Sequence, residues 1–227
     1  MTVAFADESR LERANRCPAP EVQDPPGKRR KQSMGRIILH MMISVDGMVS
    51  GPQGELDWIA NDEPLNQDHL ARLEQADAVI LGAGGYSMSS FWTAAEHDEK
   101  AEAIMRDLGR AINKIPKIVY SHQDMPVDWR NTKVHVVKDD KALVEDVERL
   151  KRETEGTIIC YGGVRFARTL VQQDLLDEIH LDVCPVILGV GQPLFTDLTH
   201  RTNLRLRETV TYDSGATMMH YEVVKTS

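Results

Sequence analysis

The chain has 227 residues, of which 41% are hydrophobic and 27% are charged, a composition that suits a globular protein with one substantial core. Its formal net charge of −8 argues against a general nucleic-acid-binding protein. No apolar run approaches the roughly 20 residues that span a bilayer, and the first residues lack the apolar segment of a secretory signal. Cys17, Cys160 and Cys184 are odd in number and widely spaced, which fits reduced thiols better than a disulfide frame. We therefore expect a cytoplasmic protein with neither membrane nor nucleic-acid partners.

Residues 1–33 differ in composition from the rest of the chain. They include the prolines at 18, 20, 25 and 26, a basic run from Lys28 to Lys31, and hardly any large apolar side chains. Such a segment buries too little apolar surface to offset the entropy of ordering it. We therefore predict a disordered N-terminal tail at 1–33 and one folded domain at 34–227. The basic run fits a solvated tail, or a start upstream of Met34, better than a nucleic-acid site.

The folded part alternates apolar runs with amphipathic ones. The first run, 36–45, is apolar nearly throughout, as in a strand covered on both faces, and a loop rich in Gly and Pro follows it. Leu70 and Leu73 then stand at helical spacing, with Asn66 as the expected N-cap. Near the end, Asp213-Ser214-Gly215 separates two runs and predicts a hairpin. The patterns predict strands over 36–45, 77–82, 117–122, 133–137, 157–161, 178–188, 204–212 and 217–224, and helices over 66–76, 97–113, 141–153 and 164–173.

This order of elements predicts the fold class. Strands that alternate with helices are typical of βαβ units and hence of a parallel sheet, and the closing hairpin adds antiparallel strands at one edge. We therefore predict a single three-layer α/β domain. It has a mixed, mostly parallel sheet of about eight strands, helices on both faces and a C-terminal antiparallel hairpin. In such sheets ligands bind beyond the carboxyl ends of the strands, so functional residues are expected there.

Two glycine clusters stand at the ends of predicted strands. Gly82, Gly84 and Gly85 follow one strand, and Gly162-Gly163 follow another. Glycines can merely permit a sharp turn. Two clusters at separate strand ends, however, favour a ligand whose phosphates need bare backbone N–H groups and the positive end of a helix. Neither cluster matches the GxGxxG or phosphate-loop pattern, so a standard Rossmann or P-loop site is disfavoured.

Two longer stretches carry a family resemblance. The stretch 156–195, GTIICYGGVRFARTLVQQDLLDEIHLDVCPVILGVGQPLF, resembles the C-terminal half of the dihydrofolate reductase-like family. It is most similar to the riboflavin-type branch, which includes the reductase domain of the bifunctional riboflavin biosynthesis protein. The stretch 36–58, RIILHMMISVDGMVSGPQGELDW, resembles the first strand and flexible loop of the same family. The resemblance covers about 34–224 and is more specific for fold and cofactor than for substrate.

The resemblance implies NADPH as the hydride donor, bound over the carboxyl edge of the sheet. It also implies a Gly-Gly peptide that is often cis in this family. Position by position, it implies that Gly162, Gly163, Val164 and Arg165 hold the diphosphate, that Ser121 and His122 lie beside the adenosine ribose and its 2′-phosphate, and that Ser44, Val45, Asp46 and Gly47 border the nicotinamide.

The sequence departs from the family after the second strand. The family commonly has Gly-Arg-x-Thr there, and its Arg and Thr contact phosphate, whereas this chain has Gly82-Ala83-Gly84-Gly85. The charge and the hydroxyl are both missing, which leaves the preference for NADPH over NADH open. Our hypothesis is that backbone N–H groups of these residues bind phosphate instead.

Reduction of a C=N or C=O bond needs a proton as well as a hydride. Asp46, beside the expected nicotinamide, and Asp57, in the loop before the first helix, are the candidate catalytic acids. Trp58 is a candidate to stack on a planar substrate. Asp-Gly is also an ordinary turn pair, and Asp57 has the alternative of being a solvated loop acid. The acids that compete for the role of Asp57 are Asp62, Glu63 and Asp68.

The sequence also contains one candidate metal set. His180, Asp182 and Cys184 alternate along one predicted strand and share a face, as zinc ligands would. No second Cys/His pair stands at ligand spacing elsewhere, so a structural set is favoured and no metal is predicted. The zinc deaminase signature, His-x-Glu with Pro-Cys-x-x-Cys, does not occur in the sequence.

These features predict an NADPH-dependent reductase that acts on the C=N or C=O group of a small, pyrimidine- or pterin-like substrate. The resemblance implies a homodimer. A true dihydrofolate reductase is the second enzyme hypothesis. A nucleotide-binding module without turnover is the third, because the phosphate-binding Arg and Thr are missing. A nucleic-acid-binding protein ranks last.

Overall fold

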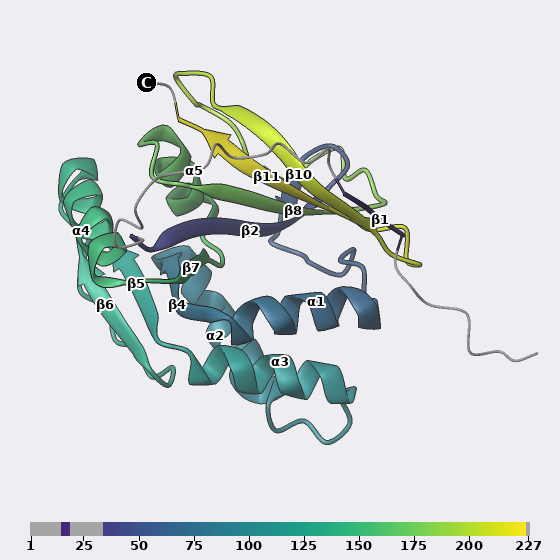
Figure 1. The fold of residues 1–227 in the computed structure, drawn as a ribbon. Coiled ribbons are helices and arrows are strands. Elements are labelled where there is room, and N and C mark those ends of the chain that lie inside the picture. Colours follow the sequence, from purple (N-terminus) through teal and green to yellow (C-terminus); the bar gives the residue numbers. More distant parts are fainter. Residues whose placement is uncertain (1–14, 19–33, 226–227) are drawn as a thin grey trace, which may run out of the picture.

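The computed structural model describes residues 15–18 and 34–225 of the chain. A nine-stranded sheet in the order β1-β10-β11-β8-β2-β7-β4-β5-β6 runs through the molecule, with helices on both sides (Figure 1). The predicted tail at 1–33 lies outside the described residues, except for Asn15–Pro18. These four residues form strand β1 against β10, so they are ordered into the sheet.

The sheet is mixed. Strands β8, β2, β7, β4, β5 and β6 pair parallel in that spatial order, and β8, β11, β10 and β1 pair antiparallel. This arrangement confirms the predicted α/β sheet with its closing hairpin. The strands are β1 (Asn15–Pro18), β2 (Arg36–Ser44), β4 (Ala76–Gly82), β5 (Lys117–Ser121), β6 (Thr132–Val136), β7 (Thr157–Cys160), β8 (Glu178–Cys184), β10 (Asn203–Thr211) and β11 (Thr217–Val224), and a separate ribbon pairs β3 (Met48–Ser50) with β9 (Gln192–Pro193).

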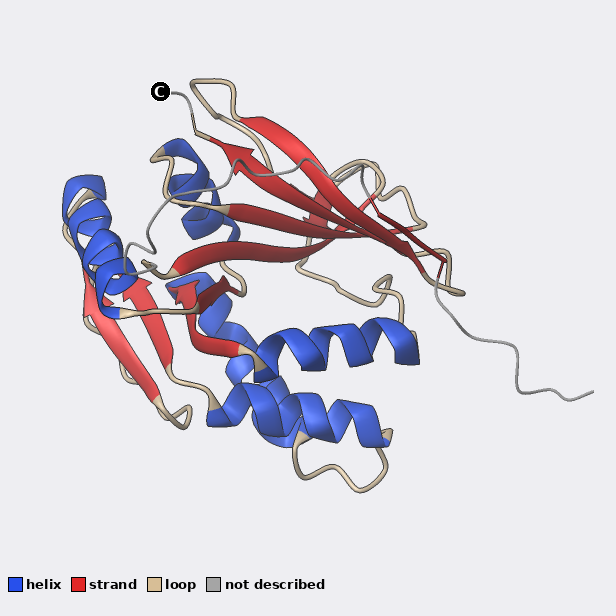
Figure 2. Cartoon of the chain, viewed as in Figure 1, coloured by secondary structure: helices blue, strands red, loops and turns tan. Residues whose placement is uncertain are grey.

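The helices cover both faces of the sheet, as predicted (Figure 2). On one face, Val147 of α4 and Leu170 of α5 are fully buried in the first hydrophobic core. On the other face, Leu73 of α1 and Leu108 of α3 pack around Leu81 of β4. Each such leucine contributes roughly 1.5–3 kcal/mol when buried, so the two cores fix the layers. The helices are α1 (Glu63–Glu74), α2 (Ser89–Ala95), α3 (Ala103–Lys114), α4 (Asp140–Glu153) and α5 (Val164–Gln172), with a 3₁₀ helix, η1 (Ala83–Met88).

The first helix begins earlier than predicted. Asp62, not Asn66, is its N-cap: the carboxylate accepts a hydrogen bond from the N–H of Leu65 at 3.3 Å. Pro64 stands in the first turn, where its missing N–H costs nothing. Asn66 is buried inside the helix, and its side chain donates to Asn61 Oδ1 at 2.9 Å. The prediction of Asn66 as the cap was therefore wrong.

Two other segments differ from the predicted elements. Residues 97–102 are not helical, so α3 begins only at Ala103, and η1 and α2 fill the stretch after Gly82 where no helix was predicted. The loop after β2 contains β3, which pairs with β9. The hairpin is confirmed, since the N–H of Tyr212 donates to the carbonyl of Ala216 at 2.9 Å and Gly215 has φ +82°.

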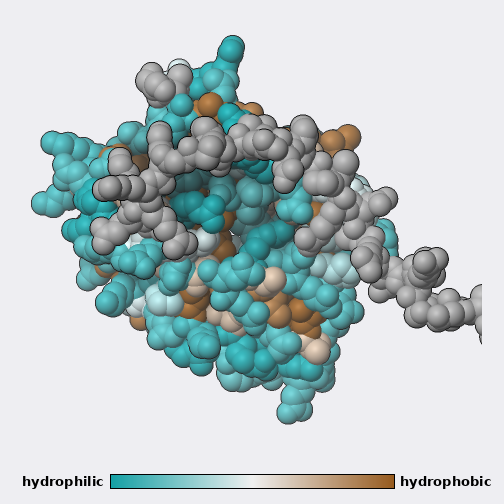
Figure 3. Space-filling model, in the orientation of Figure 1, coloured by the Kyte–Doolittle hydropathy of each residue, from teal (hydrophilic) through white to brown (hydrophobic). Residues whose placement is uncertain are grey.

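The surface agrees with the charged composition. In the space-filling view the visible face is mainly hydrophilic, and apolar side chains gather around the position of α1 and α3 (Figure 3). Among the described residues, none of the helices is both long and apolar enough for a bilayer crossing. Cys160 and Cys184 are buried free thiols.

Candidate functional site

The carboxyl ends of β4, β5 and β7 open into a cleft of about 550 Å³, which the first turns of α4 and α5 flank. Small-molecule and cofactor sites have volumes of roughly 300–1,000 Å³, so a cofactor-sized ligand fits here. The cleft lies where the fold class predicts a ligand. The predicted cofactor residues that line it are Gly82, Ala83, Gly84, Ser121, His122, Gly163, Val164 and Arg165.

The two glycine turns touch each other beside this cleft. A Cβ on Gly85 would lie 2.9 Å from the backbone of Gly162 and Gly163, and a Cβ on Gly163 would lie 2.9 Å from the nitrogen of Gly82. These glycines are therefore required for backbone-to-backbone packing. Gly84 differs, because a Cβ there would meet nothing within 4 Å. Close packing of the two turns therefore explains why Gly85 and Gly162 are glycines, and neither of them lines the cleft. Gly84 does line the cleft and has room for a ligand beside it.

The Gly162–Gly163 peptide is trans, because the described residues contain no cis peptide bond. This differs from the cis form that the resemblance implies. Both glycines instead have positive φ, +115° and +84°, a conformation that side chains rarely tolerate. The chain then turns directly into α5, with Gly163 as an N-cap that offers no side chain. The first N–H groups of α5, from Val164 onward, consequently reach the cleft without partners inside the helix.

The two ends of the cleft carry opposite charges. At the α5 end, Arg165 is exposed, and its side chain has no hydrogen bond or ion pair to another described residue. Of the described residues that line the cleft, it is the only lysine or arginine. At the α4 end the lining includes Asp139, which caps α4 by accepting from the N–H of Ala142 at 2.8 Å, and Asp140. An anionic group is therefore favoured near α5, and hydroxyl groups are favoured near α4.

The predicted nicotinamide border at the end of β2 forms a closed turn instead of lining this cleft. Asp46 accepts hydrogen bonds from Ser44 Oγ at 2.6 Å, from the N–H of Leu188 at 3.1 Å and from the N–H of Gly189 at 2.8 Å. These bonds, the one from Ser44 first, lower the pKa of Asp46 to about 2. Asp46 is therefore ionised and ties two loops together, so it cannot donate the proton expected of it at neutral pH. Val45 and Gly47 belong to the same turn, which the N–H of Gly47 closes by donating to the carbonyl of Ser44 at 2.9 Å, and they are also outside the cleft lining.

Asp57 and Trp58 do not line the cleft either. Asp57 is exposed, and Trp58 is half-buried with its Nε1–H donating to the carbonyl of Glu55 at 3.1 Å. Of the competing acids, Asp62 caps α1, and Asp68 accepts from the hydroxyl of Tyr212 at 2.7 Å. The structure therefore does not bring a predicted proton donor to the cleft.

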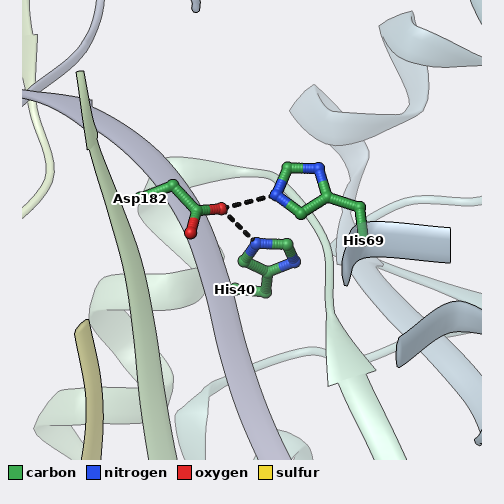
Figure 4. Close-up of side chains that lie close together, drawn as sticks. All are labelled: His40, His69 and Asp182. Carbon is green, nitrogen blue, oxygen red and sulfur yellow. Dashed lines mark hydrogen bonds and ion pairs between the residues drawn. The ribbon is translucent and has the colours of Figure 1, made fainter. Parts of the chain in front are cut away.

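A buried polar cluster lies between the sheet and α1, and sequence reasoning missed it. His40 of β2 and His69 of α1 both contact one oxygen, Asp182 Oδ2, at 2.6 and 2.7 Å (Figure 4). Asp182 is fully buried, and its Oδ1 has no partner among the described residues. The ring of Tyr161, directly before the Gly162 turn, lies 5.7 Å from that of His40. We call His40, His69 and Asp182 the inner cluster.

Burial and hydrogen bonding set the protonation of the inner cluster. Burial opposes ionisation of Asp182, but the charge interaction and hydrogen bonds with His40, together with those of His69, outweigh it and hold its pKa below the usual range. Burial lowers the pKa of His40 to about 4, against the attraction of Asp182. The cluster at neutral pH is therefore one carboxylate between imidazoles, with His40 neutral.

A second cluster of two imidazoles and one carboxylate stands earlier on β8, where Glu178 precedes Asp182 by four residues. Glu178 Oε2 lies 3.2 Å from His180 Nε2 and 3.0 Å from His220 Nε2 on β11, and its Oε1 pairs with Arg36 at 2.8 Å. Burial opposes ionisation of Glu178, but its hydrogen bond with His180, the nearby imidazole of His220 and the charge of Arg36 hold its pKa well below the usual range. We call Glu178, His180 and His220 the outer cluster.

The predicted set of His180, Asp182 and Cys184 is thus divided between different partners. Asp182 belongs to the inner cluster, His180 belongs to the outer cluster, and Cys184 Sγ accepts from the N–H of Ala60 at 3.5 Å. The missing signal was strand register, because β8 places His180 beside His40 of β2 and beside His220 of β11.

Fold and cleft together define an α/β protein of the dihydrofolate reductase-like architecture with a cofactor-sized cleft at its strand ends. The chain belongs to the RibD C-terminal domain family, whose model matches residues 36–218. It is 29% identical over 186 residues to the uncharacterized protein YyaP of Bacillus subtilis, covering 82% of this chain and 94% of that protein.

Solved structures share the fold. A crystal structure from Shewanella sp. PV-4, of a protein named for riboflavin biosynthesis, has a TM-score of 0.64 at 19% identity and covers 84% of this chain and 99% of its own. Dihydrofolate reductase from Enterococcus faecalis, solved with NADP(H), has a TM-score of 0.50 at 12% identity over 85% and 99% of the two chains. At these identities the likeness establishes the fold.

Proposed function

We propose that the protein is an NADPH-dependent oxidoreductase that transfers a hydride to the C=N or C=O group of a small pyrimidine- or pterin-like substrate. The observation that carries the proposal is the cleft itself. The open Gly84, the N–H groups at the start of α5 that have no partner within the helix, and Arg165, whose side chain is unpaired among the described residues, all line it. This combination suits a diphosphate. Membership of a family named for the RibD C-terminal domain, and the neighbour solved with NADP(H), support the same reading.

In this proposal each end of the cleft has its own task. The N–H groups at the start of α5 and the side chain of Arg165 hold the diphosphate, and Ser121 and His122 flank the adenosine ribose. When bound, the reduced nicotinamide supplies the hydride. The substrate carbon accepts it, and the neighbouring nitrogen or oxygen takes a proton from water, because Asp46 is already ionised.

A nucleotide-binding module without turnover is the second candidate. The specific observation in its favour is the placement of the predicted acids, since Asp46 is held in a turn and Asp57 faces solvent. Such a module would bind the dinucleotide through the same cleft but would not oxidise it.

The first test is a titration of tryptophan fluorescence with NADPH and with NADH. We expect both to quench the wild type, and we expect Arg165→Ala to weaken NADPH binding about tenfold, because one charge-assisted contact is lost. Arg110→Ala, which removes an exposed arginine of α3 paired with Asp107, is the matched control and should bind as the wild type does. Absence of quenching by either dinucleotide would contradict the proposal.

The second test separates the enzyme from the silent module. NADPH oxidation is followed by the absorbance of the reduced nicotinamide, with dihydrofolate, with a ribosylaminopyrimidine, and without substrate. Oxidation that depends on one of these substrates supports the reductase and identifies its class. Tight binding with no oxidation in any mixture favours the module.

A further inference from the structure

We infer that the outer cluster, Glu178, His180 and His220, is a binding site for a divalent transition metal of the zinc class. Two imidazole nitrogens and one carboxylate oxygen are the donor set that Zn²⁺ and Co²⁺ accept in proteins, whereas Mg²⁺ and Ca²⁺ require mostly oxygen. The three residues stand on adjacent strands, β8 and β11, so the sheet itself fixes their positions. Three protein ligands leave a fourth position for water.

Two of the three donor-to-donor distances are close to those of a metal centre, and all three ligand atoms lie within 4.8 Å of one another. In a tetrahedral site with bonds of about 2.0–2.1 Å, donor atoms lie roughly 3.3 Å apart. Glu178 Oε2 is 3.2 Å from His180 Nε2 and 3.0 Å from His220 Nε2. Shifts of a few tenths of an ångström would therefore admit the ion. The pairing of Arg36 with Oε1 leaves Oε2 as the ligand atom and orients the carboxylate, as an outer partner of a metal ligand does.

The orientation of the His220 ring also supports a metal site. Its Nε2 is buried and lies 3.0 Å from a carboxylate oxygen, yet it is not aligned for a hydrogen bond and has no other partner among the described residues. A buried ring nitrogen without a hydrogen-bond partner destabilises the folded protein. A metal ion held between His220 and Glu178 would remove that cost, because the nitrogen would then donate its lone pair to the ion.

Solvent exposure distinguishes this site from the inner cluster. The side chains of Glu178 and His220 are 13% and 23% exposed, so the outer cluster lies nearer to solvent than the inner cluster does. The Asp182 side chain is 0% exposed, and both of its imidazole partners already bond to it. The outer site also stands apart from the cleft, since Glu178 is the first residue of β8 and the cleft lies at the carboxyl ends of other strands. The metal site therefore does not depend on the proposed function.

The test uses the full chain without an affinity tag, stripped of metal with EDTA. Zn²⁺ is titrated by calorimetry, and Co²⁺ is added separately as a spectroscopic probe of tetrahedral coordination. We expect one equivalent of Zn²⁺ to bind the wild type, and we expect His220→Gln to lower the affinity about tenfold or more. Glu178→Gln should do the same. His200→Gln, which changes a surface histidine paired with Asp174, should bind as the wild type does.

Three results would overturn the inference. The first is no heat of binding and no Co²⁺ absorption for the wild type. The second is an unchanged affinity in both His220→Gln and Glu178→Gln when circular dichroism shows them folded. The third is loss of binding in His69→Gln with binding kept in His220→Gln, because that pattern would assign the ion to the inner cluster.

Discussion

The inner and outer clusters contain the same chemical groups, two imidazoles and one carboxylate, and both are anchored on β8. In the inner cluster both imidazoles bond to Asp182 Oδ2, and solvent is excluded. In the outer cluster only His180 forms a hydrogen bond with Glu178, His220 is misaligned, and the side chains of Glu178 and His220 are partly exposed. Composition alone therefore does not define a metal site. Whether two histidines and a carboxylate serve only structure or can also bind an ion depends on where the ring nitrogens point and on how deeply the cluster is buried.

The largest expected effect is a difference in protein stability between variants of the two clusters. Asp182→Asn replaces the buried carboxylate that bonds to both histidines. Each hydrogen bond to a charged group contributes roughly 1.5–3 kcal/mol to the free energy of unfolding, and this variant weakens two of them. Glu178→Gln changes a group that is 13% exposed and hydrogen-bonded to only one of its two histidines, so it should cost less than Asp182→Asn without metal. Urea denaturation at pH 7 measures both. Equal losses in the two variants would contradict the distinction.

The next effect is the pH dependence of stability from His40. Its pKa is about 4 in the folded protein and about 6.5 when unfolded, so the unfolded chain binds more protons in between. The contribution of His40 to the free energy of unfolding is therefore fully present above pH 6.5. It decreases as the pH falls toward 4, and about 2 kcal/mol of it is lost at pH 5. Urea denaturation across this range, with His200→Gln as the control, measures the slope. A flat profile for wild type would mean that His40 is protonated in the fold.

The same contrast between packed and open groups applies to the glycine turns. Gly163→Ala places a Cβ 2.9 Å from the nitrogen of Gly82 at φ +84°, so we expect a loss of about 1–2 kcal/mol. Gly84→Ala meets open space and should change stability by less than about 0.5 kcal/mol. Thermal unfolding of both variants measures this difference. Similar melting temperatures would show that the two turns are not interlocked.

Gly84→Ala is also the cleaner probe of NADPH binding, because a Cβ on Gly85 would disturb the packing of the turn.

Much of the fold was predictable because its signals are local. Apolar runs such as 36–45 and 77–82 gave β2 and β4, and Leu143 with Val147 gave one face of α4. Glycines at two strand ends located the cleft. The start of α1 also has a local signal, Asp62 followed by Pro64, which competes in the sequence with Asn66 as a possible cap.

The clusters could not be predicted in the same way, because their members meet only through strand register. His40 and Asp182 are 142 positions apart, and His69 contacts Asp182 from a helix, α1, and not from the sheet. Likewise, the bonds of Asp46 to Leu188 and Gly189 join loops distant in sequence, so a residue that resembled a catalytic acid is held as an ionised turn residue. Local patterns identify elements, whereas the ionisation of a side chain depends on what the fold brings to it.

The most direct test of the account is a crystal of the full chain soaked with NADPH. The account predicts density for one dinucleotide in the cleft, with its diphosphate against the first turn of α5 beside Gly84 and Arg165. Density for the dinucleotide elsewhere on the molecule, or a cleft that stays empty at saturating NADPH while its entrance is open to solvent in the lattice, would contradict it.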